Sequence, residues 1–181
     1  WPGQSVLVLG AGGGVGSFAV QLAKASGADV TGVCSTAKAD LVRSIGADRV
    51  IDHTRGDFAD GTRRYDLILD TAGNNRLRRL RRALAPGGTL VIAGGEGGGP
   101  ILGGVDRQLR ASLLSPFSGR KMRTFMSAER PQDLRDLREL IEAGRLTPVI
   151  DRTYPLAGAP EAIGRLHAGA ARGKLVVTVQ P

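Results

Sequence analysis

The chain has 181 residues, 41% of them hydrophobic and 23% charged, which excludes a disordered protein and fits one domain with or without an extra segment. The formal net charge of +8 is compatible with a nucleic acid, an anionic cofactor or simply an arginine-rich surface. With one cysteine, Cys34, and two histidines, His53 and His167, a disulfide framework is excluded and no metal site is expected. No apolar run is long enough to span a membrane and no signal peptide is visible, so we expect a cytoplasmic protein without a membrane partner.

Apolar strands alternate with amphipathic helices over most of the chain. Strands are expected at residues 6–9, 29–33, 49–51, 66–70, 89–93 and 121–126, and helices at 14–26, 38–45, 75–84 and 131–143. Residues 6–9 (VLVL) are uninterrupted apolar residues, as in a strand that is buried on both faces. The alternation predicts an α/β fold, namely a doubly wound, six-stranded parallel Rossmann sheet with helices on both faces.

Three local details of these elements are also predicted. In the helix over 14–26, the apolar face is Val15, Phe18, Ala19 and Leu22. The helix over 75–84 ends at the following APGG, and the helix over 131–143 turns Leu134, Leu137 and Ile141 inward.

After Thr147 the pattern changes to an extended piece, a helix from near Pro160 and a last strand over 174–179. Because this strand follows a complete six-strand set, we assign it to another sheet. The predicted division is a cofactor-binding domain over residues 1–147 and a separate C-terminal segment over 148–181.

The stretch VLVLGAGGGVG contains a glycine turn between a predicted strand and a predicted helix. Ala11, Gly13 and Gly16 follow the G-x-G-x-x-G spacing of the dinucleotide fingerprint, with alanine in the first position. In that pattern the first residue makes the turn, the second lets the backbone approach a pyrophosphate and the third lets the helix pack on the strand. The strand and helix on either side make dinucleotide binding the favoured interpretation.

The end of the second predicted strand bears on which dinucleotide is bound. An acidic residue at this place binds the ribose 2′-hydroxyl of NAD, but this strand ends in Cys34, Ser35 and Thr36, with Lys38 close behind. Hydroxyls and a cation suit a 2′-phosphate, so the sequence predicts NADP(H). Arg43 on the next helix is equally well explained as a solvated residue.

The chain resembles the medium-chain dehydrogenase/reductase superfamily, and most of all its zinc-independent, quinone-oxidoreductase-like branch. The resemblance covers nearly the whole chain in stretches such as DLVRSIGADRVIDHT, YDLILDTAGN, LRRALAPGGTLVIAGG and RGKLVVTV. It implies hydride transfer from NADPH to a quinone, enone or carbonyl substrate. It further implies an upstream GroES-like domain that this chain lacks, a C-terminal segment that returns to that domain, and a last strand without its sheet partners.

The same resemblance implies a set of cofactor contacts. Gly13, Gly14 and Val15 would line the pyrophosphate, and Ser35, Thr36 and Lys38 would meet the 2′-phosphate. The riboses and nicotinamide would be bordered by residues that follow two later strands: Thr71, Ala72, Gly73, Asn74, Gly94 and Gly95. Arg172 and Lys174 would reach the cofactor from the C-terminal segment, although a solvated surface role explains them nearly as well.

No residue is a strong candidate for a catalytic acid or base. Tyr65 and Tyr154 are expected to pack, His53 either borders the adenine or lies on the surface, and Cys34 is a small strand-end residue. Because the substrate pocket of the family lies between two domains, the chain alone is expected to be inactive. A homodimer through an edge strand between Lys121 and Met126 is a further expectation.

Other classes of function remain as alternatives. The run NNRLRRLRR places five arginines on one short helix, but leucines at helical spacing put them on an outer face, so no nucleic-acid partner is expected. An S-adenosylmethionine-dependent methyltransferase would need an acidic residue near Cys34. A short-chain dehydrogenase would need a lysine four residues after Tyr65 or Tyr154. An NADP(H)-binding or sensing module without catalysis stays open.

Overall fold

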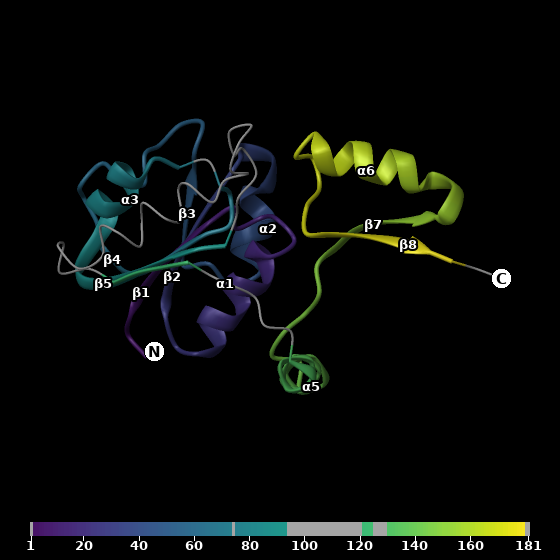
Figure 1. Cartoon of the computed structure of the whole chain (residues 1–181), viewed down its shortest axis with the longest axis horizontal. Helices are drawn as coiled ribbons and strands as arrows, with labels where there is room; N and C mark the ends of the chain where they lie inside the picture. The colour runs from purple at the N-terminus through teal and green to yellow at the C-terminus, as the bar shows by residue number, and fades with distance from the viewer. Residues whose placement is uncertain (1, 74, 94–120, 125–129, 180–181) are drawn as a thin grey trace.

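A computed structural model of the chain describes residues 2–73, 75–93, 121–124 and 130–179 (Figure 1). Its centre is a six-stranded sheet in the order β3-β2-β1-β4-β5-β6, and every neighbouring pair of strands is parallel. The strands are β1 (Ser5–Leu9), β2 (Asp29–Cys34), β3 (Arg49–Asp52), β4 (Tyr65–Asp70), β5 (Leu84–Ile92) and β6 (Lys121–Thr124). The strand order reverses between β1 and β4, where doubly wound folds bind their ligands.

Helices cover both faces of this sheet, as the alternating pattern predicts. The helices and short 3-10 turn are α1 (Gly16–Ala25), η1 (Thr36–Lys38), α2 (Ala39–Ser44) and α3 (Leu77–Ala83). Val20 of α1 and Val42 of α2 belong to one buried cluster, whereas Leu80 of α3 packs in the cluster on the opposite face. The α/β Rossmann class is therefore confirmed. Among the described residues, no helix is long and apolar enough to cross a membrane.

The buried face of α1 is rotated from the one that its apolar residues predict. Its buried residues are Gly16, Ser17, Val20 and Ala23, and Val15 is 58% exposed. Small residues face the sheet because α1 packs close to β1, and the larger side chains lie at the margins of the contact. The prediction was wrong because it considered only which side chains are apolar, and not how closely α1 packs on the sheet.

The prediction that APGG stops the third helix and precedes the strand is also corrected. β5 begins at Leu84 and includes this stretch, because Leu84 already pairs with Tyr65 of β4. The register then shifts, and regular pairing continues from Thr89 opposite Leu67. Leu80 and Leu84 are both fully buried.

The C-terminal part forms a unit of its own, which we call the C-terminal unit: β7 (Ile150–Pro155), η2 (Leu156–Gly158), α6 (Ala159–His167) and β8 (Lys174–Thr178). β8 lies in a separate two-stranded sheet, as expected, but it has a partner there, since β7 pairs with it in parallel. The expectation of a last strand without partners is wrong in that respect. The domain boundary at Thr147 stays a prediction.

α5 (Pro131–Glu142) precedes this unit and stands away from the sheet in Figure 1. Leu134 is 71% exposed and Ile141 is 37% exposed, which contradicts the prediction that they face a core. Leu146, four residues beyond the end of α5, is buried instead.

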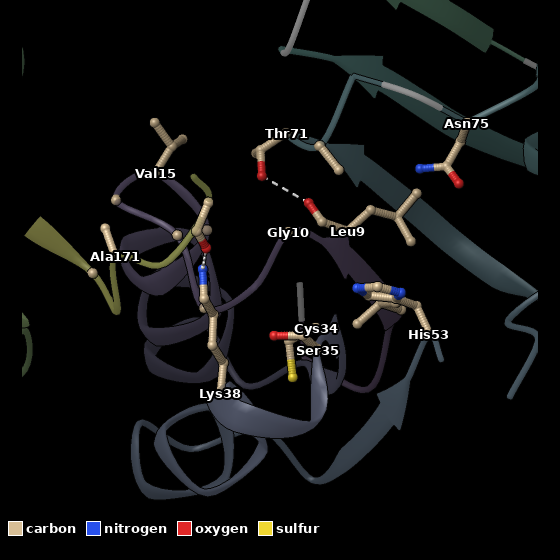
Figure 2. Close-up of a pocket in the computed structure, with 18 of the residues that line it drawn as sticks. Leu9, Gly10, Val15, Cys34, Ser35, Lys38, His53, Thr71, Asn75 and Ala171 are labelled. Atoms are coloured by element: carbon tan, nitrogen blue, oxygen red, sulfur yellow. Dashed lines mark hydrogen bonds between the residues drawn. The ribbon is translucent and has the colours of Figure 1, made fainter. Parts of the chain in front are cut away.

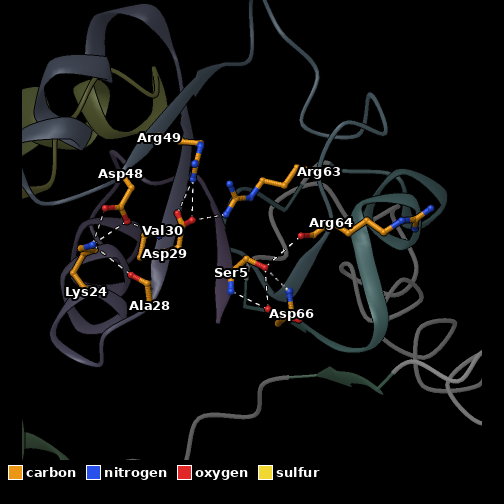
Figure 3. A network of polar contacts seen from close by, with 10 residues as sticks. All are labelled: Ser5, Lys24, Ala28, Asp29, Val30, Asp48, Arg49, Arg63, Arg64 and Asp66. Carbon is orange, nitrogen blue, oxygen red and sulfur yellow. Dashed lines mark hydrogen bonds and ion pairs between the residues drawn. The ribbon is translucent and has the colours of Figure 1, made fainter. Parts of the chain in front are cut away.

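Polar contacts tie the strands together at the amino-terminal edge of the sheet (Figure 3). Asp29 accepts hydrogen bonds from Arg49 at 2.8 and 2.9 Å and from Arg63 at 2.6 Å. Burial raises the pKa of Asp29, but the hydrogen bonds from the two guanidinium groups outweigh it and hold this pKa below its usual range. Asp66 binds both the amide and the hydroxyl of Ser5 at 2.9 Å.

Candidate functional site

A cleft of about 810 Å³ opens at the carboxyl ends of β1, β2 and β4 (Figure 2). Its floor is the glycine turn between β1 and α1, and the loop after α6 forms one wall. Of the predicted cofactor residues, nine line the cleft: Gly13, Gly14, Val15, Gly16, Ser35, Lys38, Thr71, Ala72 and Lys174. The structure thus brings together residues from four separate parts of the sequence.

The tight turn of the chain is made one residue earlier than the motif spacing predicts, at Gly10 and not at Ala11. Gly10 has a φ of +81° and makes the tight turn, while Ala11 is fully buried and packs in the core beneath the cleft. Ala11 is therefore a packing residue and does not line the cleft. A Cβ atom on Gly16 would lie 2.1 Å from the carbonyl oxygen of Gly10, so only glycine lets α1 approach the turn this closely.

This turn fits a phosphate group. Within the described residues, the amides of Gly14 and Val15 donate no hydrogen bond to the protein, and they precede a ten-residue helix. Amides at such a place, together with the helix dipole, favour an anion. A Cβ atom on Gly13 would meet only the Gly10 carbonyl oxygen, at 3.3 Å, so the space above this residue is open to a ligand. The pyrophosphate of a dinucleotide is such an anion.

At the end of β2, Ser35 and Lys38 line the cleft, whereas Thr36 does not. The Thr36 hydroxyl instead donates a hydrogen bond to the carboxylate of Asp52 at the end of β3. Cys34 also lines the cleft and is buried, and burial raises the pKa of its thiol, which therefore stays protonated and is a poor nucleophile. The predicted role of Thr36 as a phosphate contact is not supported by this arrangement.

At the end of β4, Thr71 turns its hydroxyl back to the carbonyl oxygen of Leu9 at 2.7 Å, which joins β4 to β1 across the point where the strand order reverses (Figure 2). Ala72 is an exposed residue of the cleft wall. Gly73 lies behind this wall, where its amide donates to the buried Asp70 at 3.3 Å. Asn74, Gly94 and Gly95 lie outside the described residues.

The C-terminal unit supplies more of the cleft than the sequence predicts. Lys174 lines it, with its ammonium nitrogen 5.8 Å from the centre of the Phe18 ring, but the predicted Arg172 does not. The cleft wall also includes four residues that were not predicted as cofactor contacts: Leu166, Gly169, Ala171 and Gly173. Gly173 belongs to the RGK stretch, and the only sequence signal for the other three was nearness to it.

A second set of lining residues outside the predicted cofactor contacts comes from the loop after β3, from the residues before α3 and from α3 itself. His53, Phe58, Asn75 and Arg79 line the far end of the cleft. Arg79 is held there by Asp57, at 2.7 Å, and lies 5.0 Å over the Phe58 ring. The sequence predicts that His53 either borders the adenine or lies on the surface, and its place in the cleft is compatible with the first role.

Nothing in the described part of the chain gathers three or more histidine, cysteine, aspartate or glutamate side chains as a metal site would. The expectation that the chain binds no metal stays a prediction.

Comparison with known proteins identifies the family. Residues 45–177 match the family described as zinc-binding dehydrogenase. The mitochondrial NAD(P)H oxidoreductase RTN4IP1 of Mus musculus is 39% identical over 98% of this chain, and the 2-methylene-furan-3-one reductase of Solanum lycopersicum is 31% identical over 97%. The quinone oxidoreductase structure from Coxiella burnetii superposes with a TM-score of 0.84 at 26% identity, over 99% of this chain and 54% of its own length.

The chain spans about half the length of the curated relatives it matches, 48% of the mouse protein and 40% of the tomato reductase. The mouse relative is described as mitochondrial, and the expected cytoplasmic location of this chain stays a prediction. Fold, cleft and sequence agree on one identification: the chain belongs to the medium-chain dehydrogenase/reductase superfamily, is similar to its quinone oxidoreductase and RTN4IP1 members, and corresponds to their cofactor-binding domain.

Proposed function

We propose that this chain is the NADP(H)-binding part of an oxidoreductase that transfers hydride to a quinone, enone or carbonyl substrate. The observation that carries the proposal is the cleft itself, which combines a glycine turn with free amides and the side chains of Ser35 and Lys38. This arrangement suits a ligand with a pyrophosphate in its middle and a phosphorylated ribose at one end. The relatives named as NAD(P)H oxidoreductase and as reductase support the reaction class.

The preference for NADP(H) over NAD(H) rests on charge at the end of β2. Lys38 brings an ammonium group to the cleft and Ser35 brings a hydroxyl, while the carboxylate of Asp52 at the end of β3 is engaged by Thr36 and Thr54. A 2′-phosphate gains a charge-assisted contact from Lys38 that a 2′-hydroxyl cannot gain to the same degree. The chain binds, orients and shields the dinucleotide, and the hydride itself is supplied by the nicotinamide when it is bound.

Calorimetric titration with NADPH and NADH tests this function. We expect NADPH to bind at least about tenfold more tightly, equivalent to about 1.4 kcal/mol. Equal affinities, or tighter binding of NADH, would overturn the assignment of Lys38, and the absence of binding by either would overturn the dinucleotide site. S-adenosylmethionine is the control ligand, and we expect it not to compete with NADPH.

Turnover is a separate question, because the chain spans about half the length of its relatives and the family resemblance implies a substrate pocket between two domains. We expect NADPH oxidation with a quinone or enone close to the uncatalysed rate. Robust turnover by the 181 residues alone would contradict this expectation. If the chain binds NADPH but shows no turnover, it is either an NADPH-sensing module or part of a larger enzyme. Activity assays of the full-length gene product distinguish these two roles.

We further propose that two copies associate through β6, which is the edge strand of the sheet and has no partner on its outer side among the described strands. Sedimentation should then give a dimer whose stability falls with dilution. A monomer at all concentrations is the contrary result.

A further inference from the structure

We propose that the C-terminal unit sets cofactor selectivity by holding the Lys38 ammonium at the 2′-phosphate position, with Asp151 and the Gly169 carbonyl as the positioning groups. The inference rests on the proposed NADP(H) function. It goes beyond that function, because it makes recognition of the 2′-phosphate depend on a part of the chain more than a hundred residues away.

The contact that suggests this role joins Lys38 to the loop after α6. The Lys38 ammonium donates a hydrogen bond to the carbonyl oxygen of Gly169 at 2.8 Å, across 131 positions of sequence (Figure 2). Both residues line the cleft. One N–H of the ammonium is thereby engaged, and two remain for an anion in the cleft.

The rest of the Lys38 side chain is confined as well. A Cβ atom on Gly12 would lie 2.8 Å from the Cβ and 2.9 Å from the Cδ of Lys38, so this side chain runs directly across the glycine turn. A free lysine side chain has four rotatable bonds, and fixing it costs conformational entropy. Because the protein has already confined it, a bound phosphate does not bear that cost.

The loop that carries Gly169 is held by Asp151 of β7. One carboxylate oxygen of Asp151 accepts hydrogen bonds from the Arg165 guanidinium at 2.9 Å and from the backbone amide of Arg172 at 3.2 Å. These two contacts fix both ends of the loop between α6 and β8. The amide of Gly173 then donates to the carbonyl oxygen of Gly12 at 3.0 Å, which seats the loop on the glycine turn.

Asp151 also carries a negative charge close enough to act on Lys38. Burial lowers the pKa of Lys38, and the nearby charge of Asp151 opposes that effect. The carboxylate itself repels a phosphate in the same cleft. The charge of Asp151 therefore weakens phosphate binding, whereas its positioning role strengthens it. The direction in which the affinity changes when Asp151 is replaced shows which of the two effects is larger.

The experiment measures binding of adenosine 2′,5′-bisphosphate and adenosine 5′-monophosphate to the full chain by calorimetry. If Asp151 acts by positioning, Asp151→Ala should weaken binding of the bisphosphate roughly tenfold, the usual scale for loss of hydrogen bonds to a charged group, and leave the monophosphate within about twofold. If only charge matters, the same variant binds the bisphosphate more tightly, and this result overturns the inference. Glu161→Gln on the exposed surface of α6 removes the same charge from the same unit and is the matched control, expected to change neither affinity by more than about twofold.

Two further variants keep the test decisive. Asp151→Asn preserves the volume of the side chain and should produce a smaller loss in the same direction, which covers the case in which the alanine variant fails to fold. In a Lys38→Met background, Asp151→Ala should have no further effect on the bisphosphate, because its role runs through Lys38. An undiminished effect in that background would overturn the inference.

Failure of the proposed function gives a different pattern. If wild-type protein does not distinguish the bisphosphate from the monophosphate, or if Lys38→Met leaves that distinction intact, the NADP(H) assignment itself is wrong. If Lys38→Met abolishes the distinction while Asp151→Ala preserves it, the NADP(H) assignment stands and only the positioning role is rejected.

Discussion

The hydroxyl of Thr36 donates a hydrogen bond to the carboxylate of Asp52, so the ends of β2 and β3 are joined at the rim of the cleft. The other oxygen of Asp52 accepts from the amide of Thr54 at 2.9 Å and from its hydroxyl at 2.7 Å. The hydrogen bond from Thr36, with those from Thr54, lowers the pKa of Asp52 to about 2. Thr36, which was predicted to contact a phosphate, therefore helps to fix the side chain of Asp52.

This contact should make Thr36→Val a variant whose defect depends on pH. A carboxyl group with a folded-state pKa near 2 and an unfolded-state value near 3.8 stabilises the fold above about pH 4 and loses this contribution as the pH falls toward 2. Urea unfolding should show Thr36→Val to be less stable than wild type at pH 6, with the difference narrowing at pH 2.5. A difference that is the same at both pH values would show that Thr36 acts through packing. Asp52→Asn is the control, and it should remove most of the effect of Thr36→Val.

Gly16→Ala should disturb the glycine turn, since its new methyl group would lie 2.1 Å from the carbonyl oxygen of Gly10. Relief of such a contact requires backbone movement, and we expect a loss of about 1–3 kcal/mol in the free energy of unfolding, with weakened NADPH binding. Gly164→Ala is the matched control, because the space around Gly164 in α6 is open and alanine favours a helix by up to about 1 kcal/mol. Urea titration of both variants checks the contrast, and equal stabilities would contradict it.

Gln21 of α1 fastens the segment that leads to the C-terminal unit. Its side-chain amide donates to the carbonyl oxygen of Thr147 at 3.0 Å and accepts from the amide of Thr147 at 2.8 Å. Gln21→Leu should free this segment, at a cost of about 1 kcal/mol because the contacts are partly exposed. Hydrogen exchange should show faster exchange of the Thr147 amide. Gln132→Leu on the exposed surface of α5 is the control, and protection of Thr147 that survives in Gln21→Leu would refute this role.

The arginine-rich helix α3 should not serve as a nucleic-acid surface. Arg79 pairs with Asp57 at 2.7 Å, and Arg82 donates to the carbonyl oxygen of Asp60 at 3.3 Å, so these arginines hold the loop over residues 57–60. At about 0.15 M salt we expect no measurable binding of duplex DNA or single-stranded RNA in a fluorescence anisotropy assay. Tight binding that weakens steeply with salt would reverse this prediction.

The sequence was informative about several features that depend on local pattern. The apolar run over 6–9 predicts a buried strand because parallel strands are covered on both faces, and Gly16 marks the close approach of α1 to the turn. Ala11 was assigned to the wrong role because the motif fixes spacing and not direction: Gly10 turns the chain, and Ala11 then points into the core.

Contacts between distant parts of the chain could not be predicted in this way. Neither the partner of Lys38 nor that of Thr36 leaves a periodic signal, because one residue is bonded to a carbonyl group 131 positions away and the other to the next strand. The pairing of β8 with β7 was missed for a related reason, since a strand pattern shows that a segment is extended but not which segment it joins.

The hydrogen bond between Gly12 and Gly173 also bears on how the protein is made. Translation proceeds from the amino terminus, and domains begin to fold while the ribosome is still at work. The sheet strands β1 to β4 and the glycine turn are synthesised about a hundred residues before the wall that covers Lys38. A nascent chain would therefore display an open cleft while these residues are added, and the hydrogen bond between Gly12 and Gly173 would form only after residue 173 has left the ribosomal tunnel.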